Sequence, residues 1–262
     1  MRFAYSLLVA TTLAAQAANA LPDVDYRTIP GAEFQTVLPL VEGNQTVQVN
    51  TFMLANRPVT NGEFLAFVVR HPEWRRGEAR RLFVDERYLA HWQSALTLGE
   101  RSAEDAPVTH VSWFAATAYC EAQNGRLPTW HEWELAAAAN AVRTDARDDP
   151  AWRQTRLDWY AQPTPEKFPP VMQNPANVYG IYDLHGLAWE WVEDFNGMLV
   201  TSDNREPGSL DKLEFCGAGA LSLEQKENYA VLMRVAFLSS LKAAYTTRNL
   251  GFRCARDVES KQ

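Results

Sequence analysis

Cysteine, excess positive charge and long apolar runs are all missing or scarce in this chain of 262 residues. Its 25 Lys and Arg against 32 Asp and Glu leave a net charge of −7, which argues against a broad phosphate-binding surface and a nucleic acid partner. Thirteen Gly and fourteen Pro exclude collagen-like and low-complexity chains. What is present, 47% hydrophobic and 22% charged residues, is the composition of a globular protein.

The first twenty residues have the pattern of an export signal. Arg2 gives a positive start, an apolar stretch follows, and Ala18-Asn19-Ala20 forms an A-x-A cleavage site. The stretch is too short to span a bilayer, and a buried N-terminal helix is the alternative. We therefore expect a signal peptide at 1–20, a single mature domain at 21–262, a periplasmic or secreted location, and no membrane span after cleavage.

Only three cysteines are present, namely Cys120, Cys216 and Cys254. In an oxidising compartment two of them are expected to pair, and the sequence alone allows all three pairings. Their spacing excludes a CxxC or zinc-knuckle site.

Helix caps are the clearest local signals. Thr60 or Asn61 is predicted to cap one helix, Ser112 a second, and Thr129 with Glu132 a third through a capping box. The third helix is predicted to continue through the Ala-rich run 134–141. Residues 144–178 are predicted to be irregular, with short strands at 24–29, 46–54, 186–192, 213–220 and 252–255 and a helix at 223–234. This order indicates an irregular α+β domain.

Five segments, taken in order, carry a family resemblance. They are Asn56-Arg57-Pro58-Val59-Thr60-Asn61-Gly62-Glu63-Phe64, Pro107-Val108-Thr109-His110-Val111-Ser112-Trp113, Gly125-Arg126-Leu127-Pro128-Thr129-Trp130-His131-Glu132-Trp133-Glu134, Tyr179-Gly180-Ile181-Tyr182-Asp183-Leu184-His185-Gly186-Leu187-Ala188-Trp189-Glu190-Trp191 and Asn249-Leu250-Gly251-Phe252-Arg253-Cys254. Over about residues 25–256 the chain resembles the formylglycine-generating enzyme (sulfatase-modifying factor) superfamily. The resemblance implies one compact, C-type-lectin-like domain with little regular secondary structure.

The catalytic cysteine pair of that family is missing. Formylglycine-generating enzymes bind Cu(I) through a C-x4-C pair, and the family spacing places it at Gln225 and Ala230. Cu(I) favours soft thiolate ligands, and residues 217–253 contain no cysteine. Oxidation of a sulfatase cysteine by that mechanism is therefore not expected.

The iron motif of another branch of the superfamily, His-x3-His-x-Glu, is also absent. The five histidines are far apart in sequence, and each is interpreted as structural or on the surface: His71, His91, His110, His131 and His185.

One segment of the chain resembles a calcium-binding loop of the family. By resemblance, the side chains of Asp183 and Glu190 and the carbonyls of Leu184, Gly186 and Ala188 bind Ca²⁺, which prefers oxygen ligands. The alternative is that Asp183 caps a turn and Glu190 forms a salt bridge. The family's second calcium loop falls in 144–178, where no ligands can be assigned.

Two further roles follow from the resemblance. A family disulfide implies that Cys120 pairs with Cys254, which leaves Cys216 as the candidate catalytic or redox residue, or as a buried inert thiol. Arg234 is expected to line the same groove as Cys216, on a helix with Tyr229, Leu232 and Met233 facing inward.

Two functions remain open. The first is an exported accessory or maturation factor for a periplasmic metalloenzyme, since the segments around Cys216, Asp183 and Asn249 resemble the branch found beside copper nitrite reductases. The second is a periplasmic oxidase that acts on a peptide or small molecule by a different mechanism, with an unknown redox metal.

Overall fold

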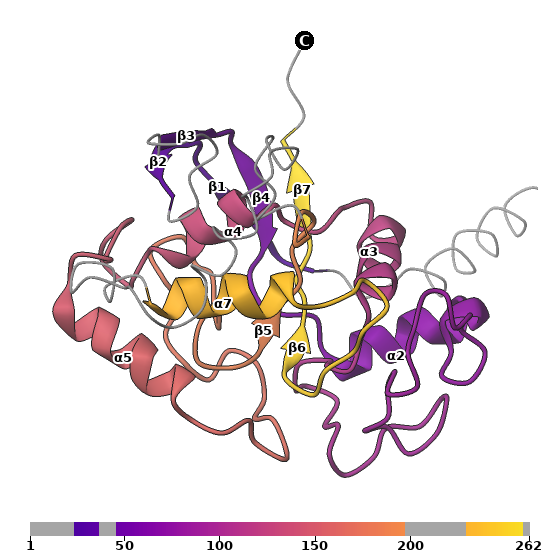
Figure 1. The fold of residues 1–262 in the computed structure, drawn as a ribbon. Coiled ribbons are helices and arrows are strands. Elements are labelled where there is room, and N and C mark those ends of the chain that lie inside the picture. The colour runs from indigo at the N-terminus through magenta and orange to yellow at the C-terminus, as the bar shows by residue number, and fades with distance from the viewer. Residues whose placement is uncertain (1–23, 37–45, 197–228, 259–262) are drawn as a thin grey trace, which may run out of the picture.

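The computed structural model describes residues 24–36, 46–196 and 229–258, which form one domain of helices and small sheets (Figure 1). The strands are β1 (Tyr26–Ile29), β2 (Ala32–Gln35), β3 (Thr46–Val49), β4 (Phe52–Ala55), β5 (Trp189–Glu190), β6 (Leu250–Gly251) and β7 (Ala255–Asp257). The helices are α2 (Asn61–Arg70), α3 (Trp113–Ala122), α4 (Trp130–Ala137), α5 (Pro150–Tyr160) and α7 (Tyr229–Ser239), with a 3-10 turn η1 (Pro72–Trp74). The predicted α+β class is confirmed.

Three sheets join distant parts of the chain. The largest has the order β1-β4-β7, all antiparallel, so that Leu54 in its central strand pairs with Arg27 on one side and Ala255 on the other. Strands β2 and β3 form an antiparallel pair, and β5 and β6 form a parallel one. Both the beginning and the end of the described chain are therefore held in the same sheet.

The three predicted helix caps are confirmed. Thr60 and Thr129 each accept a hydrogen bond from a glutamate amide three residues later, and that glutamate binds back to the cap amide. Ser112 caps α3 through the amide of Ala115. These capping groups satisfy backbone N–H groups that the first turn of a helix leaves unpaired.

Aromatic rings fill the core between α2, α3 and the C-terminal segment. Phe64 lies 5.4 Å from Phe67, 5.8 Å from Tyr119 and 6.0 Å from Phe252, measured between ring centroids. All four rings are buried. Because these rings come from three separate parts of the sequence, one continuous core holds the domain together.

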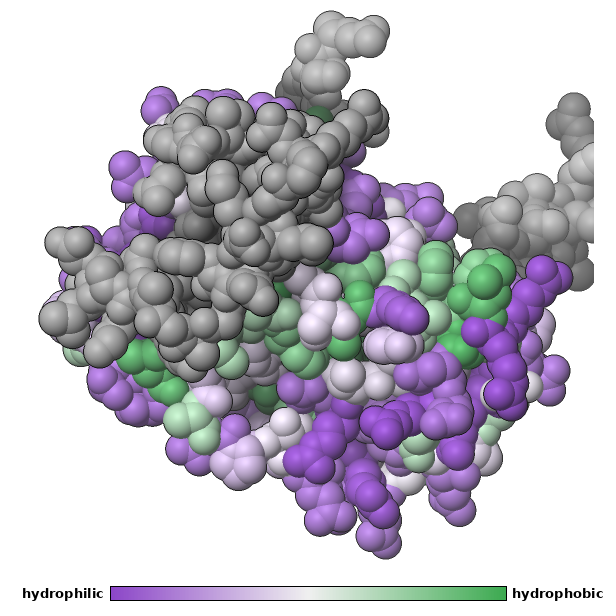
Figure 2. All heavy atoms as spheres, viewed as in Figure 1, coloured by the Kyte–Doolittle hydropathy of each residue, from purple (hydrophilic) through white to green (hydrophobic). Residues whose placement is uncertain are grey.

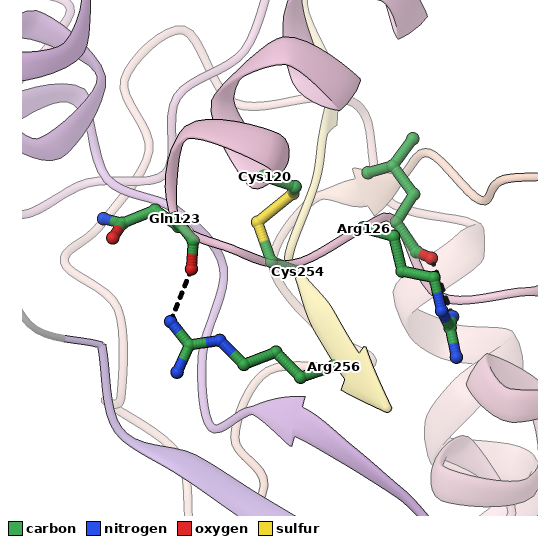
Figure 3. The surroundings of a disulfide bond; sticks show 6 residues. Cys120, Gln123, Arg126, Cys254 and Arg256 are labelled. Carbon is green, nitrogen blue, oxygen red and sulfur yellow. Dashed lines mark hydrogen bonds between the residues drawn. A yellow bond between two sulfur atoms is a disulfide. The ribbon is translucent and has the colours of Figure 1, made fainter. Parts of the chain in front are cut away.

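A disulfide joins Cys120 on α3 to Cys254 just before β7, with 5.5 Å between the Cα atoms (Figure 3). In the same region the Arg256 guanidinium donates a hydrogen bond to the carbonyl oxygen of Gln123, and the amide of Ala255 donates to Arg126 O. The pairing implied by the family resemblance is thus present in the structure.

The structure corrects several local predictions. The stretch 144–178 is not wholly irregular, because it contains α5, which begins with Asp149 as a cap and Pro150 at its first position. Helix α4 ends at Ala137, before the end of the Ala-rich run, and the strand predicted at 252–255 is replaced by β6 and β7 on either side. The strand predicted at 213–220 lies outside the described residues, as do residues 223–228 of the predicted helix 223–234; its remaining part, 229–234, lies in α7, which continues to Ser239.

Within the described ranges, no helix combines the length and apolar character that a bilayer crossing requires. The expected signal peptide at 1–20 lies outside those ranges and stays a prediction.

Candidate functional site

A fully buried ion pair joins two of the five segments that carry the family resemblance. Arg253 donates from Nε and Nη2 to both carboxylate oxygens of Glu190, at 2.7–3.0 Å, and both side chains are inaccessible to solvent. Trp133 adds a hydrogen bond from Nε1 to Glu190 Oε2 at 2.7 Å. Three donor groups therefore saturate the Glu190 carboxylate, as a buried charge requires.

Arg234 on α7 is the second buried arginine at this place. Its guanidinium lies 3.6 Å from the centroid of the Trp133 ring and donates to the backbone oxygen of Glu190. Burial lowers the pKa of Arg234 to about 10, so the group still carries its charge at neutral pH. Arg234 thus joins α7 to α4 and β5 and is buried, while the groove that it was expected to share with Cys216 falls outside the described residues.

The predicted calcium loop turns sharply around Asp183. Asp183 and Gly186 both have left-handed backbone angles, with φ of 57° and 94°. The Asp183 carboxylate accepts a hydrogen bond from the amide of Met172 at 2.6 Å. Burial raises the pKa of Asp183, and this effect outweighs the hydrogen bonds from Met172 and Asn174, which lower it.

The predicted calcium ligands divide into two groups. Asp183, Leu184 and Gly186 line one cavity of about 380 Å³, together with the oxygen-bearing side chains of Asn174 and Asn177. Glu190 does not line it, because its carboxylate is held by Arg253 and Trp133, and Ala188 is buried outside that lining. The donors that fit a hard cation are therefore Asp183 and the loop carbonyls, without the Glu190 side chain. Calcium binding stays a prediction.

A second, aromatic cavity of about 250 Å³ also borders this loop, at Gly186 and Leu187. It is lined by Trp159, Tyr160, Phe168 and Trp189, among others, with Asn249 as a polar member. Trp189 also packs edge to face against Phe237 of α7, with 4.7 Å between centroids. Burial raises the pKa of Tyr160 to about 12, so its hydroxyl is a neutral hydrogen-bonding group there.

The described residues do not include Cys216, the candidate catalytic or redox residue, so the structure does not place it. On α7, Met233 is 42% exposed, and the prediction that it faces inward is wrong. In the described part of the chain, no three His, Cys, Asp or Glu side chains gather in a way that could hold a metal ion.

The histidines occupy the structural positions expected of them, and one pair adds a feature that the sequence did not indicate. His185 is held by a hydrogen bond between Nε2 and Ala137 O and is surrounded by tryptophan rings. His91 and His110 stack at 4.6 Å between centroids, and burial lowers their pKa values to about 3 and about 4. They are 19 residues apart, and no local motif connects them.

Comparison with known proteins agrees with this architecture. The sulfatase-modifying factor enzyme 1-like domain matches residues 13–258. A formylglycine-generating enzyme of Streptomyces coelicolor is 30% identical over 210 residues, which cover 73% of this chain and 60% of that protein. A Mus musculus protein named inactive C-alpha-formylglycine-generating enzyme 2 is 26% identical over 87% of this chain and 84% of its own length.

Among solved structures, CarF is similar to this chain with a TM-score of 0.50 and 16% sequence identity, and the match covers 92% of this chain and 100% of CarF. At this low identity the similarity shows a common fold only. The chain belongs to the family of sulfatase-modifying factor enzyme 1-like domains. It spans 34–60% of the length of the first curated relatives that it matches.

Proposed function

We propose that this chain is an exported accessory or maturation factor for a periplasmic metalloenzyme, built on a formylglycine-generating enzyme domain without the copper chemistry. The main support for the proposal is that the chain has too few free cysteines to bind Cu(I) as the family enzymes do. Two of the three form the Cys120–Cys254 disulfide, which leaves Cys216 as one thiol where Cu(I) binding needs two.

Two further features support a role without that catalysis. The family positions of the cysteine pair, Gln225 and Ala230, carry no sulfur. The mouse relative that matches most of both chains is named as inactive. A retained fold with a lost catalytic pair fits a protein that binds a client, since a fold by itself does not specify an activity.

A peptide assay tests the loss of catalysis. Purified protein is incubated with a Cys-x-Pro-x-Arg peptide, Cu(I) and oxygen, with the Streptomyces coelicolor enzyme as the positive control. Mass spectrometry should show an unchanged peptide thiol. Conversion of the cysteine to formylglycine would contradict the proposal.

A deletion strain tests the accessory role. Loss of the gene should lower the metal content and activity of a periplasmic metalloenzyme, with a copper nitrite reductase as the first to assay. Both the parent gene and a Cys216→Ser variant should restore the activity. If no periplasmic metalloenzyme changes, the accessory role is wrong.

A second candidate is an oxidase that uses another mechanism. The aromatic cavity beside Trp189, about 250 Å³ in volume, favours this candidate because it could enclose a small side chain or molecule. Metal analysis of the protein from its native host distinguishes the two. A stoichiometric redox metal that is lost in Cys216→Ala supports the oxidase, and its absence supports the accessory role.

A further inference from the structure

The segment between η1 and α3 forms one wall of a large open cavity lined by arginines. Arg76, Arg81 and Arg87 lie on this wall, and Tyr245 and Thr246, between α7 and β6, lie on the other. The volume is about 760 Å³, which is in the range of sites that enclose ligands with several functional groups. Figure 2 shows hydrophilic side chains gathered on the visible face below α2, where Figure 1 has the loops that follow this helix.

Among the described residues, no carboxylate forms an ion pair with these three arginines. Arg81 and Arg87 are exposed, and neither side chain forms an ion pair or hydrogen bond within the described part of the chain. Arg76 is fixed in place because its Nη1 donates to Trp92 O at 2.7 Å, which leaves its charge without a carboxylate partner among the described residues. Two guanidinium groups are thus free to bind a ligand, beside a third that is held in position.

The main acidic group of the cavity already has a structural role. The Asp85 carboxylate accepts hydrogen bonds from the amide and the hydroxyl of Thr246 and from the amide of Arg87. It therefore ties the two walls together and does not pair with a guanidinium. Glu86 also lines the cavity, while the Lys242 ammonium, 5.7 Å from the ring of Tyr245, adds a further positive charge.

The histidines near this wall do not supply its charge. Burial lowers the pKa of His110 to about 4, and the positive charges of Arg248 and Arg87 lower it further against the effect of Asp85. His91 has its pKa lowered to about 3 by burial, with smaller contributions from His110 and Arg76. At neutral pH the positive charge therefore comes from the guanidinium groups and the Lys242 ammonium, and these histidines do not contribute to it.

We propose that this cavity binds an acidic peptide segment of a partner protein, whose carboxylates pair with Arg81, Arg87 and Arg76. Guanidinium and carboxylate groups match in planar, two-pronged geometry, which favours arginine where carboxylates are recognised. Tyr245, 41% exposed, offers a ring for the apolar part of the peptide. A single inorganic anion would fill only a small part of this volume.

The positive charge of the cavity contrasts with the net charge of the chain. The protein carries a net charge of −7, so an acidic partner gains no attraction from the overall charge, and the arginines of the cavity supply it locally. Such complementarity orients an encounter and favours one docking position. The proposal goes beyond the accessory role above and holds whether or not the partner is a metalloenzyme.

Binding of a fluorescein-labelled hexaglutamate peptide, followed by fluorescence anisotropy at low ionic strength, tests the proposal. The test variant is Arg81→Gln/Arg87→Gln, which removes two charges without removing a hydrogen bond of the fold. The matched control is Arg27→Gln/Arg101→Gln, because these arginines are also exposed and lie outside the cavity. We expect the test variant to lose affinity by about tenfold or more, as for loss of charge-assisted hydrogen bonds.

The control variant should bind like the parent, and hexaglutamine should not bind. Equal loss of affinity in both double variants would assign binding to net charge and overturn the proposal, as would no binding of hexaglutamate to the parent. Inorganic phosphate is added as a competitor against chloride at equal ionic strength. If phosphate displaces the peptide and chloride does not, the cavity is a small-anion site and the proposal is wrong. If neither anion displaces the peptide, the result supports a peptide site.

Discussion

Glu190 shows how one residue can match a family motif and still have another partner. Its side chain was expected to bind calcium, with a salt bridge as the alternative, and the structure has the salt bridge to Arg253. The two residues are 63 positions apart, so the sequence could not show this pairing. Removing one partner of a buried pair leaves an uncompensated charge, which typically costs about 3–5 kcal/mol.

The calcium loop can be tested by separating Asp183 from Glu190. Added Ca²⁺ should raise the melting temperature of the parent, EDTA should reverse this, and Asp183→Ala should abolish the response, since it removes the carboxylate that lines the cavity. Glu190→Gln should melt at a lower temperature but keep its response to Ca²⁺. Differential scanning calorimetry measures all three. A parent melting curve that neither EDTA nor Ca²⁺ alters rules out the calcium site.

The stacked pair of His91 and His110 predicts a pH dependence of stability. The unfolded chain binds protons near the ordinary histidine pKa of about 6.5, whereas the folded chain does so only near 3 for His91 and near 4 for His110. Between these values the unfolded state holds more protons. The free energy of unfolding should therefore fall as the pH drops below about 6.5, by up to about 1.4 kcal/mol per pH unit for each histidine.

His91→Gln should reduce this slope, because it removes one of the buried histidines that contribute to it; His110 and His185, whose pKa values burial also lowers, keep their contributions. Urea unfolding between about pH 4.5 and pH 7 measures it. His71→Gln is the control, since that side chain is 37% exposed and lies outside the pair. An unchanged slope in His91→Gln would contradict the assignment.

At the scale of elements, α2 and α4 begin in the same way. In each, a capping-box glutamate also accepts two hydrogen bonds from an arginine six positions earlier, Arg57 to Glu63 at 2.8 Å and Arg126 to Glu132 at 2.6–2.7 Å. The carboxylate therefore satisfies a backbone amide and binds the preceding turn to the helix. The caps were predictable from the sequence because a capping box is local, whereas the two-pronged pairing depends on how the chain enters the helix.

Thr129→Ala should lower the free energy of unfolding by about 1 kcal/mol, since the amide of Glu132 loses its acceptor. Thr129→Ser keeps the hydroxyl and should stay close to the parent. Chemical denaturation of the three proteins compares them. Equal losses in both variants would assign the effect to packing of the threonine methyl group instead of the cap.

At the scale of the whole molecule, the three-stranded sheet holds the two ends of the described chain together, and the disulfide joins the middle of the chain to its C-terminal end. Cys120 and Cys254 are separated by 134 positions, and β1, β4 and β7 pair within the same region. Helix α5 was missed because the prediction for 144–178 followed the Pro-, Asp- and Gln-rich composition of that stretch, although Asp149 and Pro150 form a start signal and Trp152, Trp159 and Tyr160 recur at helical spacing.

Closing a loop of this length should stabilise the protein by at most about 5 kcal/mol, and denatured-state structure reduces this value. Cys120→Ala/Cys254→Ala should therefore lower the melting temperature strongly, whereas Cys216→Ala should not. In denatured, unreduced parent protein, iodoacetamide should modify Cys216 alone. Peptide mapping that finds Cys216 in a disulfide would contradict this connectivity.

The sequence by itself determined the features that depend on composition or on neighbours along the chain. These are the five family segments, the three helix caps, and the lack of a second free thiol for copper. The tertiary structure alone decided the partner of Glu190, the stacking of His91 on His110, and the cavity that joins Arg81 to Thr246. The reason is physical: these residues are related by no periodicity along the chain, and only the packing of distant segments against one another decides which side chains meet.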